Sequence, residues 1–239
     1  MIGRLVWVLS LSLVAVITIG VQFDRESERN PALAQTVPGL FRSSAQPVIA
    51  TSAIASDDAQ KGLEEARKLV RRRPIPAEHL RILSQAQLEA GEVARGALTI
   101  QYAAQRGWRD GISQEAMLRF ALQAGDMAEA ARRYTALFLR RGTNDEQLEA
   151  VGGDILGDPG GRGRATFSAI IIGSDRWHGR FLRRGARVLP PDAFLEVFEG
   201  IVASGGEFDC NALRYSDNIL RSRGTLDNGV LAATIEERC

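Results

Sequence analysis

Two ten-residue stretches of the chain repeat one another at a distance of 34 residues. LEAGEVARGA at 88–97 and LQAGDMAEAA at 122–131 share Leu, Ala, Gly, an acid, an apolar residue, Ala and a final Ala in register. Gly91 and Gly125 therefore occupy equivalent places in otherwise helix-forming sequence. A glycine there allows the positive φ that a tight turn between two helices requires. The recurrence predicts a repeating helix–turn–helix unit.

Small residues follow each turn at a fixed distance. Gly96 and Ala130 stand five positions after the turn glycines, and one period earlier the equivalent residue is Gly62. Because the distance between packed helices depends on the side chains at the contact, these positions predict a close approach of the paired helices. One period of 34 residues before Gly91, the pattern predicts a turn at Asp57. The first unit then ends at Pro74, since proline does not continue a helix.

Helical periodicity predicts an all-α fold. Met127, Ala130, Tyr134 and Phe138 fall on one face of a helix, with the spacing typical of an amphipathic segment. No window shows the alternation that a half-buried strand requires. We expect helices near 57–73, 76–90, 92–106, 112–124, 126–141, 144–156, 162–172, 175–188, 191–204, 209–223 and 226–238.

The paired helices and their 34-residue period resemble the tetratricopeptide repeat over residues 57–141. The matching residues are Pro74, Gly91, Gly96, Gly125, Ala130 and Tyr134. The apolar N-terminus, the segment ERNPALA and the Arg- and Ala-rich repeats are also similar to membrane-anchored and exported tetratricopeptide-like proteins of alphaproteobacteria. The resemblance implies an α-solenoid of antiparallel helix pairs that binds a protein or peptide partner.

An apolar run at residues 5–21 predicts a membrane segment. Its 17 residues are near the short limit for spanning a bilayer. Arg4 precedes the run and the acid-containing QFDRESER follows it, which favours a cytoplasmic N-terminus. We expect a single-pass anchor in the bacterial inner membrane, with the C-terminal domain in the periplasm. The alternative is a signal sequence that is cleaved during secretion to the periplasm.

The chain divides into four predicted segments. They are an anchor at 1–21, a flexible linker at 22–56, tetratricopeptide-like repeats at 57–156, and degenerate helical repeats with a closing helix at 157–239. The linker prediction rests on three prolines and little periodicity, with a short helix around 32–43 as the one element expected in it.

Charge and motifs argue against several classes of function. The formal net charge of +1 provides no field that would attract nucleic acid. His79 and His178 have no partners at metal-ligand spacing, and His79 is expected to be solvated in the first turn of its helix. Adjacent glutamates on a helix point apart and cannot flank one glycosidic bond. We predict no enzyme, no metal, no small-molecule cofactor and no nucleic-acid partner.

The repeat register indicates a peptide-binding groove on the concave face, which the first helix of each unit lines. The residues are Glu78, Arg81, Gln85, Ile112, Glu115, Arg119 and Glu149. Their mixed charge suits an extended or helical peptide. We expect a membrane-anchored periplasmic scaffold in cell-envelope assembly or export. The alternatives are an assembly subunit without a peptide groove and an all-α envelope enzyme that acts on glycans.

Two further features leave alternatives open. Trp177 and His178 lie between arginines in RWHGR, so they could form a surface patch, or the Trp could pack between repeats. Cys210 and Cys239 are an even pair in a domain expected outside the cytoplasm, which permits a disulfide. Against the disulfide, Cys239 is the last residue and Cys210 begins a predicted helix.

Overall fold

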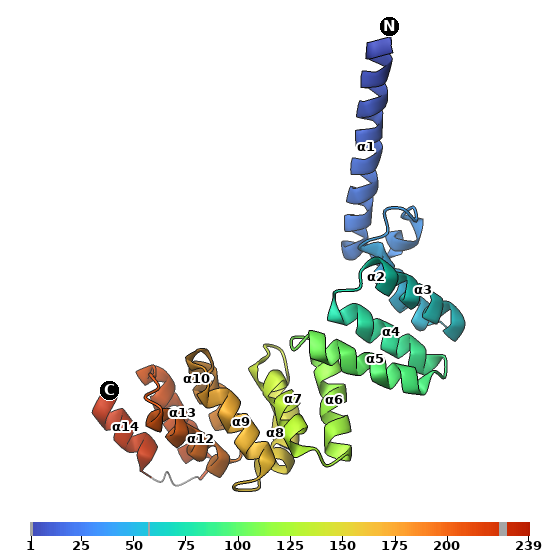
Figure 1. Ribbon diagram of the computed structural model, residues 1–239. Coiled ribbons are helices and arrows are strands. Elements are labelled where there is room, and N and C mark those ends of the chain that lie inside the picture. The colour runs from blue at the N-terminus through green and yellow to red at the C-terminus, as the bar shows by residue number, and fades with distance from the viewer. Residues whose placement is uncertain (1, 57, 225–228) are drawn as a thin grey trace. The chain divides into compact units, whose positions relative to one another are not determined.

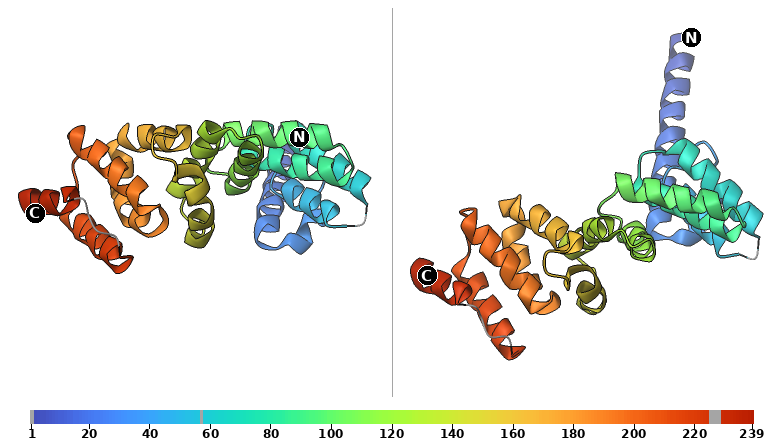
Figure 2. Two further views of the ribbon diagram at one scale, coloured as in Figure 1. Left: turned by 90° about the horizontal axis from the view of Figure 1, so that it is seen from below. Right: turned by 60° about the horizontal axis from the view of Figure 1, so that its bottom comes forward.

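The computed structural model describes residues 2–56, 58–224 and 229–239, and within these ranges the regular elements are all helices (Figure 1). The all-α prediction is confirmed, with helices stacked in sequential antiparallel pairs. The chain forms two compact units, Met1–Asp110 and Gly111–Cys239. Within each unit, helices that follow one another in the chain lie side by side (Figure 2).

The first unit contains one long helix, one 3₁₀ helix and four helices of the stack. They are α1 (Ile2–Arg29), η1 (Pro31–Thr36), α2 (Ala45–Ile54), α3 (Ala59–Arg72), α4 (Ala77–Glu89) and α5 (Val93–Arg106). The strongest contacts join α2 to α3 and α4 to α5. These two pairs are the repeating units of this part of the chain.

The second unit continues with the pair α6–α7 and then with less regular helices. Its elements are α6 (Gly111–Gln123), α7 (Met127–Leu139), α8 (Asp145–Leu156), α9 (Arg162–Ile172), η2 (Asp175–Trp177), α10 (His178–Arg180), η3 (Phe181–Gly185), α11 (Ala186–Val188), α12 (Pro191–Ala203), α13 (Cys210–Ser222) and α14 (Val230–Arg238). The helix predicted at 175–188 is present as four short pieces, of which η3 is a π-helical turn.

The turn glycines have the predicted conformation. Gly91 and Gly125 have φ values of 79° and 69°, and each joins the two helices of a pair. The residue after each glycine donates its backbone N–H to a carbonyl five residues earlier, Glu92 to Gln87 and Asp126 to Ala121. This bond closes the end of the first helix in the manner of a Schellman motif.

The small residues after the turns lie at close helix contacts, as predicted. A Cβ added to Gly62 would stand 3.1 Å from the Cα of Ile54 on α2. A Cβ added to Gly96 would stand 2.8 Å from the Leu88 side chain on α4. Ala130 is fully buried on α7. The side chain of Asp126 also caps α7 by accepting the backbone N–H of Glu129 at 3.0 Å.

The linker prediction for residues 22–56 is wrong in its structural content. Most of the segment is helical, because α1 continues to Arg29 and α2 forms the partner of α3. The sequence of α2 is apolar or small on nearly all sides, so it gives little helical periodicity. Pro47 lies in the first turn of α2, where a proline is tolerated. The predicted joint at Asp57 is outside the described residues, and neighbouring Asp58 caps α3.

The long helix α1 is exposed over its apolar part and docks at its end. It is long and apolar enough to cross a membrane by length and composition, as either a span or a signal sequence (Figure 1). Further along the same helix, Asp24 and Ser27 are buried. The Asp24 carboxylate accepts the backbone N–H groups of Ser43, Ser44 and Ala45 at the start of α2. The apolar helix is therefore joined directly to the first repeat.

Aromatic side chains fill the core of the second unit. Tyr134, Phe138 and Phe167 form one contacting group, with the rings of Phe138 and Phe167 edge to face at 5.5 Å. Phe181 and Phe194 stack at 4.8 Å in a second group. Aromatic residues bury large areas and fix mutual orientation, so the less regular helices after α8 still share one core.

Candidate functional site

Two cavities run along the exposed side of α6, and both are lined by Glu115 and Arg119. The first has a volume of about 140 Å³. The second, of about 350 Å³, is an open depression on α6 alone and includes Ile112 and Phe120. We call the two together the α6 groove. Its residues are Ile112, Glu115, Ala116, Leu118, Arg119, Phe120, Leu122, Gln123, Leu137, Gln147, Leu148, Ala150 and Val151.

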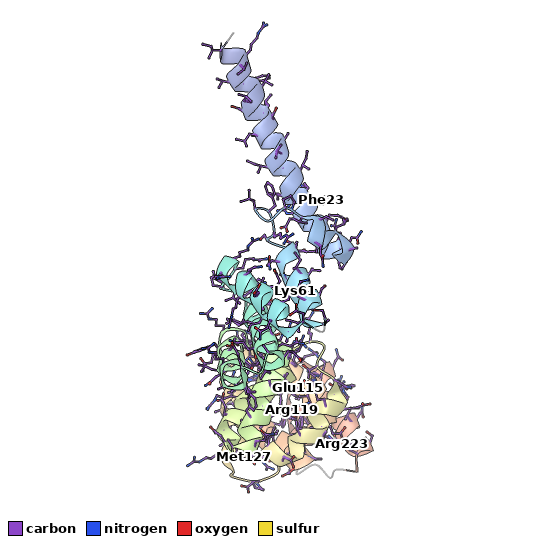
Figure 3. The ribbon with its side chains drawn as sticks, turned by 90° about the vertical axis from the view of Figure 1, so that its right-hand side faces the viewer. Phe23, Lys61, Glu115, Arg119, Met127 and Arg223 are labelled. Carbon is purple, nitrogen blue, oxygen red and sulfur yellow. A yellow bond between two sulfur atoms is a disulfide. The ribbon has the colours of Figure 1, made fainter. Side chains whose placement is uncertain are left out.

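Apolar side chains form most of the groove wall, with one ion pair at its centre. Ile112 and Phe120 are 59% and 44% exposed, which is unusual for large apolar residues on a helix of a packed pair. The Arg119 guanidinium contacts the Glu115 carboxylate at 2.5 Å across one helical turn (Figure 3). Such an exposed pair contributes little to stability, so both groups are free to contact a partner.

Hydrogen bonds join the helices that carry the groove. The Tyr134 hydroxyl of α7 donates to the carbonyl of Leu148 on α8 at 3.3 Å, and burial raises the pKa of this tyrosine. Arg133 of α7 donates to the Gln114 side chain of α6 at 3.1 Å. These contacts fix α6 and α8 against α7, so the groove is a preformed feature of the second unit.

A cluster of charged side chains orders the start of α7. Glu129 accepts hydrogen bonds from Arg132 at 2.6 Å and Arg133 at 2.7 Å. Burial alone would raise the pKa of Glu129, but the hydrogen bonds from the two arginines lower it below its usual range. The carboxylate therefore stays ionised and holds Arg133 in the position from which it contacts α6.

The seven predicted groove residues lie on three helices, α4, α6 and α8. Ile112, Glu115 and Arg119 come together in the α6 groove. Glu78, Arg81 and Gln85 share α4 in the first unit. Sequence reasoning missed the apolar groove residues Leu118, Phe120, Leu122 and Val151. The i, i+4 spacing of Leu118 and Leu122 was the sequence signal that could have indicated an apolar stripe on this helix.

The remaining members of the predicted set have other contacts. Arg81 is partly buried and lies 3.4 Å from the Asp110 carboxylate. Glu149 is exposed on α8, and its carboxylate is 3.9 Å from Arg223 of α13. Glu78 and Gln85 are exposed on α4.

The predicted surface patch at Trp177 and His178 is not present. His178 is only 2% exposed, and its ring lies 6.1 Å from the ring of Phe208. Trp177 is half-buried against the core of the second unit, in agreement with the alternative of packing between helices. His79 is also buried, not solvated, with its Nδ1 2.9 Å from the carbonyl oxygen of Arg73.

A disulfide joins Cys210 to Cys239, with the two Cα atoms 5.7 Å apart. The bond ties the first turn of α13 to the end of α14 and so closes the C-terminal helix pair. Disulfides persist in oxidising compartments. Together, the exposed apolar helix and the disulfide point to a membrane or extracytoplasmic location.

Among the described residues, no group of three or more His, Cys, Asp or Glu is placed to hold a metal ion. The geometry thus offers a preformed groove with apolar walls and a central ion pair. Compared with known family models, curated proteins and solved structures, the chain gives no significant match, and it stands as an all-helical protein of stacked helix pairs.

Proposed function

We propose that this protein is a membrane-anchored scaffold of the bacterial envelope that binds a segment of a partner protein in the α6 groove. The observation that carries the proposal is the exposed apolar wall of α6, with Ile112 and Phe120 beside the Glu115–Arg119 pair. The 34-residue spacing of the turn glycines Gly91 and Gly125 supports a tetratricopeptide-like repeat as the framework.

The groove limits the chemistry of the partner segment. The smaller cavity has a volume of about 140 Å³ and mainly apolar walls, which suits one large aliphatic side chain. Glu115 and Arg119 stand beside it and can pair with charges of opposite sign on the segment. An amphipathic helix with one aliphatic anchor and flanking charges of both signs satisfies these conditions. The binding role is not catalytic.

Filling the small cavity is a direct test of this function. Val151→Trp on α8 places a large ring where the aliphatic anchor is expected, so it should abolish partner capture while the helices stay folded. Asp154→Trp is the matched control, because Asp154 is exposed on the same helix and does not line the cavity. Tagged full-length protein is crosslinked in membranes and purified. Equal capture by both variants would exclude the α6 groove as the binding surface.

The location proposed for this scaffold is the periplasmic side of the inner membrane. The order of Arg4, the apolar run and the acid-containing segment supports a cytoplasmic N-terminus. The disulfide Cys210–Cys239 supports an oxidising environment for the second unit. Alkaline phosphatase fused after Asp110 should be active, and an inactive fusion would reverse the proposed topology.

A second candidate is an assembly subunit, and the exposed face of α5 favours it. Leu98 and Tyr102, one helical turn apart, are 50% and 52% exposed on this helix. An apolar face of this kind can pair with a second copy of the chain. Sedimentation of the full chain in detergent tests the idea. Concentration-dependent dimers that are lost in Leu98→Glu would support it, and a monomer at all concentrations would exclude it.

A further inference from the structure

A strongly basic cavity lies in the second unit, apart from the residues of the α6 groove. Its volume is about 510 Å³. The lining, which we call the arginine pocket, is Arg140, Arg141, Gly142, Thr143, Asp145, Arg180, Arg183, Arg184 and Arg187. Six of these nine residues are arginines and one is an acid, so the lining carries a large positive excess. The chain as a whole is nearly neutral, which makes this local excess distinctive.

The one carboxylate of the lining is already shared by two arginines. Arg184 donates its Nε–H to Asp145 at 2.7 Å, and Arg187 donates to the same carboxylate at 2.7 Å. Arg184 is buried and also donates to the carbonyls of Phe138 and Arg140. Arg184 therefore forms part of the fold at the base of the pocket. The single negative charge of Asp145 is already outnumbered by the positive charges of Arg184 and Arg187.

Arg141, Arg180 and Arg183 line the cavity, and the lining holds no second acid beside Asp145. Arg141 is exposed, and Arg183 has its nearest carboxylate, Asp209, at 3.6 Å with both side chains more than half exposed. Arg180 donates to the carbonyl of Leu139 at 2.7 Å. Burial lowers the pKa of Arg180, and the charges of Arg141, Arg184 and Arg183 lower it further. Within its own lining, the pocket thus holds more positive charge than its one carboxylate can neutralise.

The backbone adds to the positive electrostatic potential of the arginine pocket. Helix α8 begins at the pocket, with Asn144 as its N-cap and Thr143 and Asp145 in the lining. The N-terminus of a helix carries partial positive charge. Arginines from the end of α7 and from the α10–α11 region therefore line one open cavity together with a helix N-terminus.

We propose that the arginine pocket binds a phosphate group that carries at least two negative charges. Planar guanidinium forks match the oxygens of phosphate and form strong, charge-assisted hydrogen bonds. The lining comes from two short segments, 140–145 and 180–187, around a cavity that is open to solvent. A ligand of high charge density matches six arginines from two short segments better than an extended acidic peptide, which brings one charge per residue. The group can belong to a free phosphate compound or to a lipid headgroup.

Titration of the full-length protein with inorganic pyrophosphate tests the proposal. The protein is held in phosphatidylcholine nanodiscs at fixed ionic strength, because binding of this kind depends on salt. Calorimetry should show saturable binding at one site per chain. Absence of saturable binding up to roughly 1 mM pyrophosphate would overturn the proposal.

Two double variants locate the site. Arg141→Gln with Arg183→Gln removes exposed charge from the pocket and leaves the buried Arg184 in place, and it should weaken pyrophosphate binding at least about tenfold. Arg132→Gln with Arg221→Gln removes the same charge from exposed helix positions of the same unit outside the pocket. Equal loss in both variants would mean that binding follows net charge, which would overturn the assignment to the pocket.

Competition then identifies the source of the phosphate. Pyrophosphate binding is compared in nanodiscs that contain phosphatidic acid and in phosphatidylglycerol nanodiscs of equal charge. Weaker binding in the phosphatidic acid nanodiscs would assign the site to a lipid phosphomonoester. Equal binding in the two would assign it to a free phosphate compound. A hexaglutamate peptide tests whether the pocket instead binds an acidic segment of a protein. Tighter binding of that peptide than of pyrophosphate, lost in Arg141→Gln with Arg183→Gln, would overturn the phosphate proposal in favour of an acidic segment.

Discussion

The carboxylate of Asp24 lies 2.8 Å from the backbone nitrogen of Ala45, so a residue of the long apolar helix caps the first helix of the stack. One turn earlier, Gly20 lies under the ring of Phe41, where an added Cβ would be 2.6 Å from a ring carbon. Because these contacts are part of the packed first unit, removing α1 would leave the start of α2 without its cap.

The Asp24 cap predicts that α1 stabilises the first repeat. Asp24→Ala leaves three backbone N–H groups without their acceptor and should lower the free energy of unfolding by about 1–2 kcal/mol. Glu28→Ala, at an exposed position of the same helix, is the control and should have little effect. Thermal unfolding of the full chain in detergent measures both. Equal melting temperatures for the two variants would contradict the role of Asp24.

The same contacts bear on processing of the N-terminus. A chain that needs Gly20 and Asp24 for packing should keep them, so the intact mass should be found in the membrane fraction. Mass spectrometry of the purified protein measures this. A soluble product that lacks the first 20 or so residues would instead identify a signal sequence.

Ala130 provides a test of the repeat register. Ala130→Leu adds three carbon atoms at a fully buried helix contact and should cost about 1–3 kcal/mol through overpacking. Ala169→Leu, at an exposed position of α9, makes the same chemical change without a close neighbouring helix and serves as the control. Denaturant unfolding compares the two. Wild-type stability in Ala130→Leu would mean that the helices are packed in a different register.

The disulfide should stabilise the C-terminal helix pair. Cys210 and Cys239 close a loop with a sequence separation of 29, and loss of such a constraint costs ~2–4 kcal/mol in the chain-entropy account. Cys239→Ser should expose α14 to proteolysis, and reduction of the wild type should have the same effect. Reduction of Cys239→Ser itself is the control and should change nothing further. Identical digestion patterns with and without the disulfide would refute this prediction.

Asp145 predicts a pH dependence of stability. Burial alone would raise the pKa of this carboxyl, but hydrogen bonds from Arg187 and Arg184 lower it below its usual range. Since the folded pKa lies below the unfolded value, the stabilisation is complete above the unfolded pKa and is lost as pH falls through the folded pKa. Asp145→Asn should therefore be less stable than wild type near pH 7, with the difference shrinking below about pH 4. Urea titrations across this pH range measure the difference in the free energy of unfolding between the two proteins. A difference that does not change with pH would contradict the prediction.

Most helices of the stack could be predicted from sequence because their apolar faces repeat with helical spacing and their turns carry glycine. Helix α2 could not, since Ala45–Ile54 is apolar or small on nearly every side and contains a proline. Glu115 and Arg119 were predicted as groove residues from the repeat register, whereas the place of Val151 beside them depends on how α8 packs. The burial of His178 likewise depends on Gly206 and Phe208, which are distant in the sequence.

Photocrosslinking from position 120 tests the central claim, that the α6 groove holds a partner segment, most directly. A photoreactive amino acid in place of Phe120 lies in the groove, and the same group in place of exposed Arg132 on α7 lies outside it. In intact cells, position 120 should give one discrete adduct with a partner protein, position 132 should not, and Val151→Trp should remove the adduct. The same adduct from both positions, or an adduct that persists in Val151→Trp, would contradict a scaffold that works through this groove.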